Sequence, residues 1–95
     1  MSKIKVSFFS LLIDIVGREE ISLSINSEMT IKNILEKLRL SFGKSFEEKI
    51  FNSEGILNKY IIIGLNGKDI RKFDGLDTII KDGDTISILP AIAGG

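Results

Sequence analysis

Alternating apolar and polar side chains predict two strands near the beginning of the chain. Over residues 3–9, isoleucine, valine and phenylalanine alternate with lysine and serine, the period of a half-buried strand. Residues 21–25, ISLSI, repeat that pattern. The apolar residues 10–16 between them fit either a strand or a short helix, and Gly17 ends this segment. The two strands are therefore expected to form a hairpin with a long connection.

Helical periodicity follows the second strand. Apolar residues fall on one face of a helix over residues 31–42, with Thr30 as its N-cap and Gly43 where a C-cap belongs. Residues 45–48, SFEE, carry the capping-box pattern of serine and glutamate three positions apart. They predict a second, short helix over about residues 46–51.

Strand and turn patterns return in the last third of the chain. Residues 59–65, KYIIIGL, are nearly continuously apolar, as in a strand buried on both faces. Asn66-Gly67 is the strongest two-residue hairpin pattern, and it predicts a return strand over residues 68–71. Two later Asp-Gly pairs mark turns, and residues 85–89 predict the last strand, which Pro90 closes.

This order of elements predicts an α+β fold: one mixed sheet, one main helix packed across it, and a short second helix. If the first and last strands are neighbours in the centre of the sheet, the fold is a β-grasp. A chain of 95 residues allows one such domain, assigned to residues 1–90, with a flexible C-terminal Gly-Gly tail over residues 91–95.

The composition excludes several classes of function. The chain has 13 basic and 13 acidic residues, so it lacks the positive excess of a nucleic-acid or anionic-membrane binder. No apolar run is long enough to span a membrane, and no signal peptide is recognisable, so a cytoplasmic location is expected. Without cysteine or histidine there is no thiolate metal site and no histidine base. A carrier or binding protein is favoured over an enzyme, and no metal site is expected.

The C-terminus holds the candidate chemistry. After Pro90 the sequence ends Ala91-Ile92-Ala93-Gly94-Gly95. Glycine has no Cβ, so this segment can thread a narrow channel, and Gly95 presents an unhindered carboxylate. An enzyme that activates this carboxylate with ATP would make an acyl adenylate open to sulfur or to an amine. The alternative is an ordinary frayed chain end.

Three segments resemble one known family. Residues 76–95, LDTIIKDGDTISILPAIAGG, resemble the end of the MoaD/ThiS family, which are ubiquitin-like β-grasp sulfur carriers. Residues 60–70, YIIIGLNGKDI, resemble the family's hairpin, and residues 4–9 its first strand. The middle of the chain, residues 43–58, is longer than in compact bacterial members. It is similar to archaeal members, some of which are small archaeal modifier proteins (SAMPs).

The resemblance implies a role in molybdenum or tungsten cofactor synthesis. An E1-like adenylating enzyme would use ATP to activate Gly95, and sulfur transfer would leave a thiocarboxylate there. As the small subunit of molybdopterin synthase, the carrier would dock on a MoaE-like large subunit and donate sulfur to a pterin precursor. The carrier would bind no cofactor itself, and the catalytic residues would belong to its partners.

Other acceptors of the activated terminus remain open. A ubiquitin-like modifier would form isopeptide bonds between Gly95 and lysines of target proteins. A ThiS-like carrier would supply sulfur for thiazole or for tRNA thiolation. A noncovalent interaction module would not need the Gly-Gly end at all.

Docking on a partner needs a surface besides the tail. We expect Pro90, Ala91, Ile92, Ala93 and Gly94 to contact the partner. An apolar patch on an exposed sheet face, formed by Phe9, Leu11, Leu65 and Phe73, is expected to extend that contact, unless these side chains belong to the core. The four aspartates between residues 74 and 84 either steer the chain to a basic partner or serve as turn residues.

Overall fold

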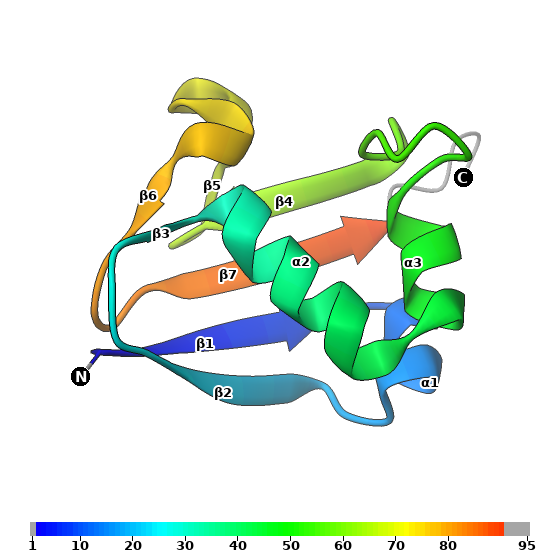
Figure 1. Ribbon diagram of the computed structural model, residues 1–95, viewed down its shortest axis with the longest axis horizontal. Helices are drawn as coiled ribbons and strands as arrows, with labels where there is room; N and C mark the ends of the chain where they lie inside the picture. The colour runs from blue at the N-terminus through cyan, green and yellow to red at the C-terminus, as the bar shows by residue number, and fades with distance from the viewer. Residues whose placement is uncertain (1, 91–95) are drawn as a thin grey trace.

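The computed structural model describes residues 2–90, in which five strands form one mixed sheet in the order β2-β1-β7-β4-β5 (Figure 1). Their bounds are Ser2–Phe8 (β1), Glu20–Ile25 (β2), Ile61–Leu65 (β4), Lys68–Asp69 (β5) and Thr85–Pro90 (β7). A separate two-stranded ladder joins β3 (Met29–Thr30) to β6 (Ile79–Ile80). The helices are α1 (Leu11–Val16), α2 (Ile31–Phe42) and α3 (Lys44–Ile50), with 3-10 turns η1 (Ile70–Lys72) and η2 (Gly75–Asp77).

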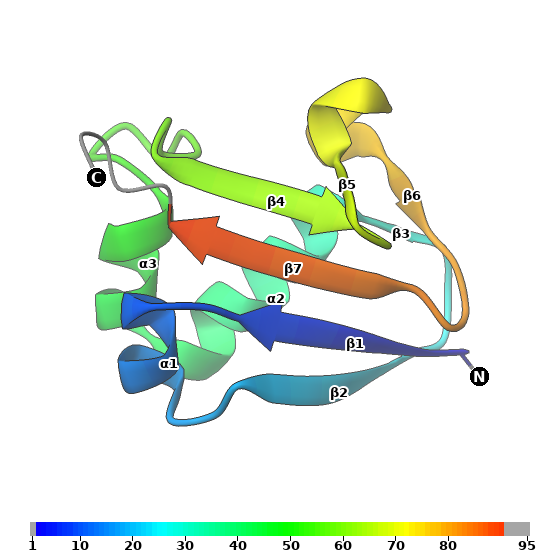
Figure 2. The ribbon, with the colours of Figure 1, turned by 180° about the vertical axis from the view of Figure 1, so that it is seen from behind.

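The first and last strands are central neighbours, as a β-grasp requires. β1 pairs with β7 in parallel, and β4 pairs with the other side of β7 in antiparallel register, with Ile61 opposite Pro90. Helix α2 crosses one face of this sheet, and α1 and α3 lie at one end of it (Figure 1). No described element covers the opposite face (Figure 2). The prediction of a mixed sheet with one main helix across it is confirmed.

Helix α2 has the predicted limits because both of its ends are capped. Asn33 N–H donates to Thr30 Oγ1 at 3.3 Å, and Thr30 N–H donates to Asn33 Oδ1 at 2.9 Å. At the other end, Gly43 N–H donates to the Arg39 carbonyl, and Gly43 has φ of 81°, which favours glycine. The apolar face, at most 1% exposed, packs on the sheet through Ile31, Ile34, Leu35 and Leu38.

The short second helix is confirmed, but its predicted cap is wrong. Helix α3 begins at Lys44 directly after Gly43, and no side chain caps its N-terminus. The Ser45 and Glu48 pair therefore forms no capping box. Burial holds this helix instead: Phe46 is 0% exposed and its ring lies 6.4 Å from that of Phe8 and 5.7 Å from that of Phe42.

The ambiguous segment 10–16 is a helix rather than a strand. Helix α1 buries Leu12 to 1% exposure and ends at Gly17, whose N–H donates to the Ile13 carbonyl at 2.7 Å. Gly17 has φ of 81° and ψ of 8°, the left-handed conformation in which helices commonly end. The predicted long connection between the first two strands therefore contains one short helix.

Two strand predictions were too long. β4 begins at Ile61, and its Ile62 is only half-buried, so this strand is not covered on both faces. The return strand stops at Asp69 because its carboxylate caps the next turn, accepting the Arg71 N–H at 2.9 Å and the guanidinium at 2.6 Å. These hydrogen bonds lower the pKa of Asp69 to about 2. The two-residue strands β3 and β6 were not predicted.

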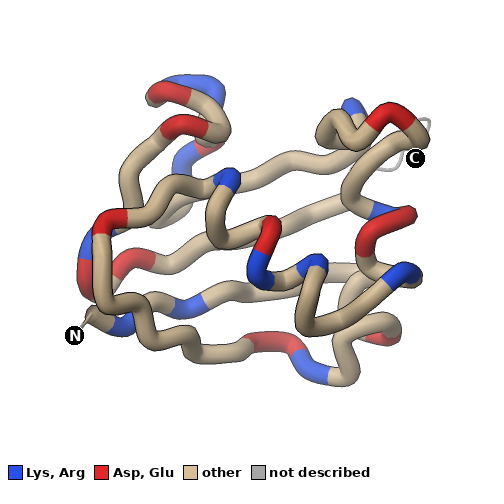
Figure 3. The backbone as a smooth tube through the Cα atoms, viewed as in Figure 1, with Lys and Arg blue, Asp and Glu red and all other residues tan. Residues whose placement is uncertain are grey.

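Charged side chains of both signs are interspersed along the chain (Figure 3). In the described range, residues 2–90, no helix combines the length and the apolar character needed to cross a lipid bilayer.

Replacing Phe46 with alanine should destabilise the fold by about 3–5 kcal/mol, because the ring is fully buried against Phe8 and Phe42. Chemical denaturation followed by circular dichroism measures this loss. The matched change Phe73→Ala, at a ring that is 44% exposed, should cost well under half as much. Equal losses of stability in the two variants would contradict the conclusion that the aromatic cluster holds α3 in place.

Candidate functional site

Strand β7, the last described element, lies in the centre of the sheet. β7 pairs with β1 from Thr85 to Ile88 and with β4 from Ile86 to Pro90. Its inward side chains, Ile86 and Ile88, are 0% exposed. Two ladders and the core therefore hold β7 as far as Ile88, and the β4 ladder alone continues to Pro90, five residues before Gly95. The predicted tail residues Ala91, Ile92, Ala93, Gly94 and Gly95 lie outside the described residues.

The Asp82-Gly83-Asp84 turn ties the start of β7 to both of its neighbours. Asp82 Oδ1 accepts the Lys3 N–H at 2.7 Å, and Gly83 N–H donates to the Lys3 carbonyl at 2.8 Å. Asp84 accepts hydrogen bonds from Asn66 Nδ2 at 2.9 Å and from Lys81 N–H at 2.7 Å. Turn chemistry thus accounts for these two carboxylates.

An apolar surface surrounds the point where the tail begins. Ile62 pairs with Leu89, and both are half-buried on the face that α2 does not cover, since Ile61, Ile63 and Ile88 point into the core. Phe9 follows the buried Phe8, which pairs with Ile88, and is 42% exposed. We call Phe9, Ile62, Leu89 and Pro90 the exit patch; it lies at the end of β7, the strand whose arrowhead is visible in Figure 2.

The structure separates the four residues that were predicted to form one patch. Phe9 and Leu11, which is 52% exposed, lie at the exit end of the sheet. Leu65 is 8% exposed and belongs to the core, so its prediction as an exposed contact residue is wrong. Phe73 is 44% exposed but follows η1 at the opposite end (Figure 1). The sequence reading missed Ile62 and Leu89, although both alternate with core residues along their strands.

A polar groove of about 620 Å³ lies between α2, α3 and residues 51–58. The guanidinium of Arg39, which lines this groove, is already paired with two carboxylates: it donates to Glu36 at 2.8 Å and to Glu47 at 3.0 Å. Hydrogen bonds to Glu36, followed by those to Glu47, raise the pKa of Arg39. The groove therefore offers an anionic ligand little free positive charge at Arg39.

Within residues 2–90, no three His, Cys, Asp or Glu side chains converge as ligands of a metal ion would. The described residues provide a folded domain, a position for Pro90 fixed by the β4 ladder, and an apolar surface beside it.

These features define a ubiquitin-like β-grasp protein in which the last described strand, β7, is central in the sheet. The chain belongs to the ThiS family, which it matches over residues 6–95. It is a sulfur carrier or small modifier of the ThiS/MoaD type, and carriers of this type are not enzymes.

Three relatives illustrate the range of the family. A protein of Archaeoglobus fulgidus assigned as a sulfur carrier is 38% identical over 74 residues, covering 77% of this chain and 83% of its own. The small archaeal modifier protein 1 of Methanosarcina acetivorans superposes with a TM-score of 0.85 at 33% identity, over 100% of this chain and 98% of its own. CysO in the BexX/CysO complex of Amycolatopsis orientalis gives 0.73 at 28% identity, over 97% and 99%.

Replacing Asp84 with alanine should lower stability by about 1–3 kcal/mol, because the Asn66 amide and the Lys81 N–H lose their acceptor. Urea denaturation measures the change. Asp77→Ala is the matched control, since the Asp77 side chain is exposed and makes no hydrogen bond within residues 2–90; its effect should stay within about 0.5 kcal/mol. A larger loss of stability in Asp77→Ala than in Asp84→Ala would refute the role given to Asp84.

Proposed function

We propose that Gly95 carries sulfur as a thiocarboxylate and donates it in molybdopterin synthesis, with this chain as the small subunit of molybdopterin synthase. The observation that supports this most directly is the position of Pro90, where β7 ends and the C-terminal tail begins. The family match runs through Gly95, and the central strand of the domain ends five residues earlier, at Pro90. Molybdenum and tungsten versions of this cofactor require the same sulfur chemistry.

The proposed chemistry takes place on the terminal carboxylate. In the active site of an E1-like enzyme, that carboxylate attacks the α-phosphate of ATP and pyrophosphate leaves. Hydrosulfide, or sulfur delivered at the same oxidation level, then attacks the carbonyl carbon of the acyl adenylate. A C–S bond forms, the C–O bond to AMP breaks, and AMP departs with the electron pair. Glycine leaves this carbon unhindered, because no side chain flanks it.

The proposed docking combines the tail with the exit patch. Five extended residues reach at most about 17 Å, so Gly95 can enter a partner's active site only if the partner also approaches Pro90 closely. Phe9, Ile62 and Leu89 lie beside that point. We assign Pro90, Ala91, Ile92, Ala93 and Gly94 to the partner's channel and the exit patch to its rim. The partners are an E1-like adenylating enzyme and a MoaE-like large subunit, and the complex of CysO with BexX supports partnership of this kind.

A second candidate is protein conjugation. The likeness to the small archaeal modifier protein 1 of Methanosarcina acetivorans favours it. Here a lysine amine of a target protein, rather than sulfur, attacks the adenylate, and an isopeptide bond forms. Both functions share the exit, the tail and the activating enzyme, so one chain can serve both.

Incubation with a cognate E1-like enzyme, ATP and sulfide should convert the Gly95 carboxylate into a thiocarboxylate. Intact-mass and C-terminal-peptide mass spectrometry should show one sulfur-for-oxygen exchange. Fragmentation should place it on Gly95, since residues 91–95 contain no methionine whose oxidation imitates that mass. A chain lacking Gly95 should keep its circular dichroism spectrum and gain no sulfur.

The thiocarboxylated chain is then used to identify the molecule that accepts its sulfur. The thiocarboxylated chain, mixed with a MoaE-like large subunit and the pterin precursor, should yield molybdopterin and return to the carboxylate. Ladders of conjugates in host lysate, without molybdopterin formation, would assign the terminus to protein modification. An unchanged mass with an E1-like enzyme that activates another carrier would refute both.

The exit patch should set the affinity for the activating enzyme. When Ile62 and Leu89 are both replaced with alanine, the KM of the activating enzyme for this chain should rise about tenfold, a change worth about 1.4 kcal/mol. The kcat of that enzyme should change little. Steady-state pyrophosphate release measures both constants. Phe73→Ala removes an exposed apolar side chain at the other end of the sheet and should leave KM unchanged. Equal effects would contradict docking confined to the exit.

A further inference from the structure

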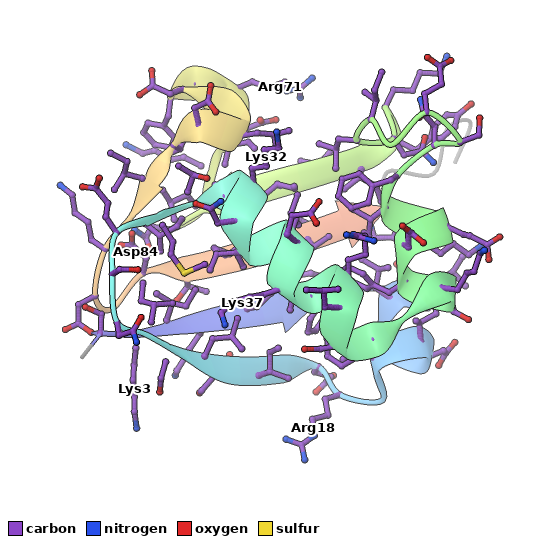
Figure 4. The ribbon with its side chains drawn as sticks, in the orientation of Figure 1. Lys3, Arg18, Lys32, Lys37, Arg71 and Asp84 are labelled. Carbon is purple, nitrogen blue, oxygen red and sulfur yellow. The ribbon has the colours of Figure 1, made fainter. Side chains whose placement is uncertain are left out.

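The ladder between β1 and β7 ends two residues before β7 itself ends. It begins near Asp84, labelled in Figure 4, where the Lys5 N–H donates to the Asp84 carbonyl at 3.0 Å. The last pair joins Phe8 to Ile88, and β7 then continues to Pro90 beside β4 alone. The chain of β1 turns away into α1 at this point (Figure 2).

Neither strand offers the hydrogen bond that would continue the ladder. Lys5 bonds to β7 and every second residue follows the same phase, so the Phe9 carbonyl would next accept the N–H of residue 90. Residue 90 is a proline, which has no N–H. The Phe9 carbonyl instead accepts the Leu12 N–H, at 3.2 Å, in the turn that leads into α1. The two interruptions coincide at one step of the sheet.

The turn that diverts β1 has a backbone conformation that suits glycine. Ser10 has φ of 54° and ψ of −132°. These values are close to those of the first central residue of a type II′ turn, a position at which φ is positive and glycine is preferred. A serine in this conformation is strained.

Nothing in the Ser10 side chain offsets this strain. One other non-glycine residue within residues 2–90, Asn66, has a positive φ, and its side chain donates to Asp84 at 2.9 Å and accepts a backbone N–H of β7. The Ser10 side chain is exposed and makes no hydrogen bond within the same range. Its buried neighbours impose the turn, since Phe8 and Leu12 are each 1% exposed and hold the chain on both sides.

We propose that Ser10 is a positioning residue: its turn ends the β1–β7 ladder early, so that the activating enzyme can draw the chain away from the sheet at Pro90. This inference rests on the proposed function, in which that enzyme takes in the residues that follow Pro90. If β1 continued, the enzyme would first have to break hydrogen bonds to it, and the fraction of carrier ready to bind would fall. Pro90 supports the same result because it has no N–H for β1.

Replacing Ser10 with glycine tests the strain. The turn should persist, and the folding equilibrium constant should rise about fivefold, because glycine adopts this conformation without steric cost. Asn66→Gly is the matched control: it also places glycine at a positive φ, but it removes two hydrogen bonds and should lower that constant. Urea denaturation measures both changes. A loss of stability in Ser10→Gly would contradict a strained turn.

Hydrogen exchange followed by NMR tests the interrupted ladder without any enzyme. Pro90→Ala supplies the missing N–H, which should still exchange rapidly because the Ser10 turn keeps the Phe9 carbonyl on Leu12. Adding Ser10→Val should turn that carbonyl towards β7, because valine favours strands and disfavours positive φ. The new amide should then exchange at least about tenfold more slowly. Ser22→Val, the same change on exposed β2, should leave it rapid.

Steady-state kinetics of the activating enzyme test the functional consequence. In the variant that combines Ser10→Val with Pro90→Ala, KM should rise about fivefold beyond the product of the two single effects, because one more hydrogen bond must break. The kcat should change little. Combining Ser10→Gly with Pro90→Ala keeps the turn, so it should show no such excess.

Three results would overturn the proposal. The first is slow exchange of the new amide in Pro90→Ala alone, which decides the matter even if Ser10→Val does not fold. The second is rapid exchange in a folded variant that carries both changes. The third is an unchanged KM in that variant despite a slowly exchanging amide, because the turn would then be merely structural. If no E1-like enzyme activates the unaltered chain, the proposed function fails, while the exchange measurements still decide whether Ser10 ends the ladder.

Discussion

The parallel pairing of β1 with β7 determines the rest of this molecule. It places the first and last strands side by side in the middle of one sheet, where Val6, Ile86 and Ile88 are 0% exposed. Parallel neighbours cannot be joined by a tight turn, so the intervening elements must pass over or around the sheet. Helix α2 covers one face, and the strands that remain flank the central pair on either side.

This arrangement suits a protein that presents its terminus to others. A terminus on an outer strand would move with local fraying, whereas β7 is held by ladders on both sides and by the core beneath it. The Asp82-Gly83-Asp84 turn fixes where β7 begins, and Ile61 opposite Pro90 fixes where it ends. In the proposed function, folding stability and terminal chemistry thereby occupy different parts of the chain. A partner can supply all catalytic groups while the carrier supplies only position.

Local patterns in the sequence determined much of this structure. The limits of α2 could be predicted because the apolar periodicity and the two capping residues, Thr30 and Gly43, all indicate the same segment. Errors arose where distant contacts decide the outcome. Leu65 follows half-buried Ile62 on one apolar strand, and only the position of α2 above β4 shows which of the two is covered. The return strand stops early because Asp69 finds Arg71, a local competition that alternation does not reveal.

The difference between local patterns and distant contacts also explains which parts of the surface could be predicted from the sequence. The D-G-D turn and the Gly-Gly end are contiguous motifs and could be recognised directly. The exit patch combines Phe9 of one segment with Ile62 and Leu89 of two others. In the sheet order β2-β1-β7-β4-β5, these segments become neighbours because β7 lies between β1 and β4. No local pattern indicates that order, so the patch could not be located until the pairing of the strands was known.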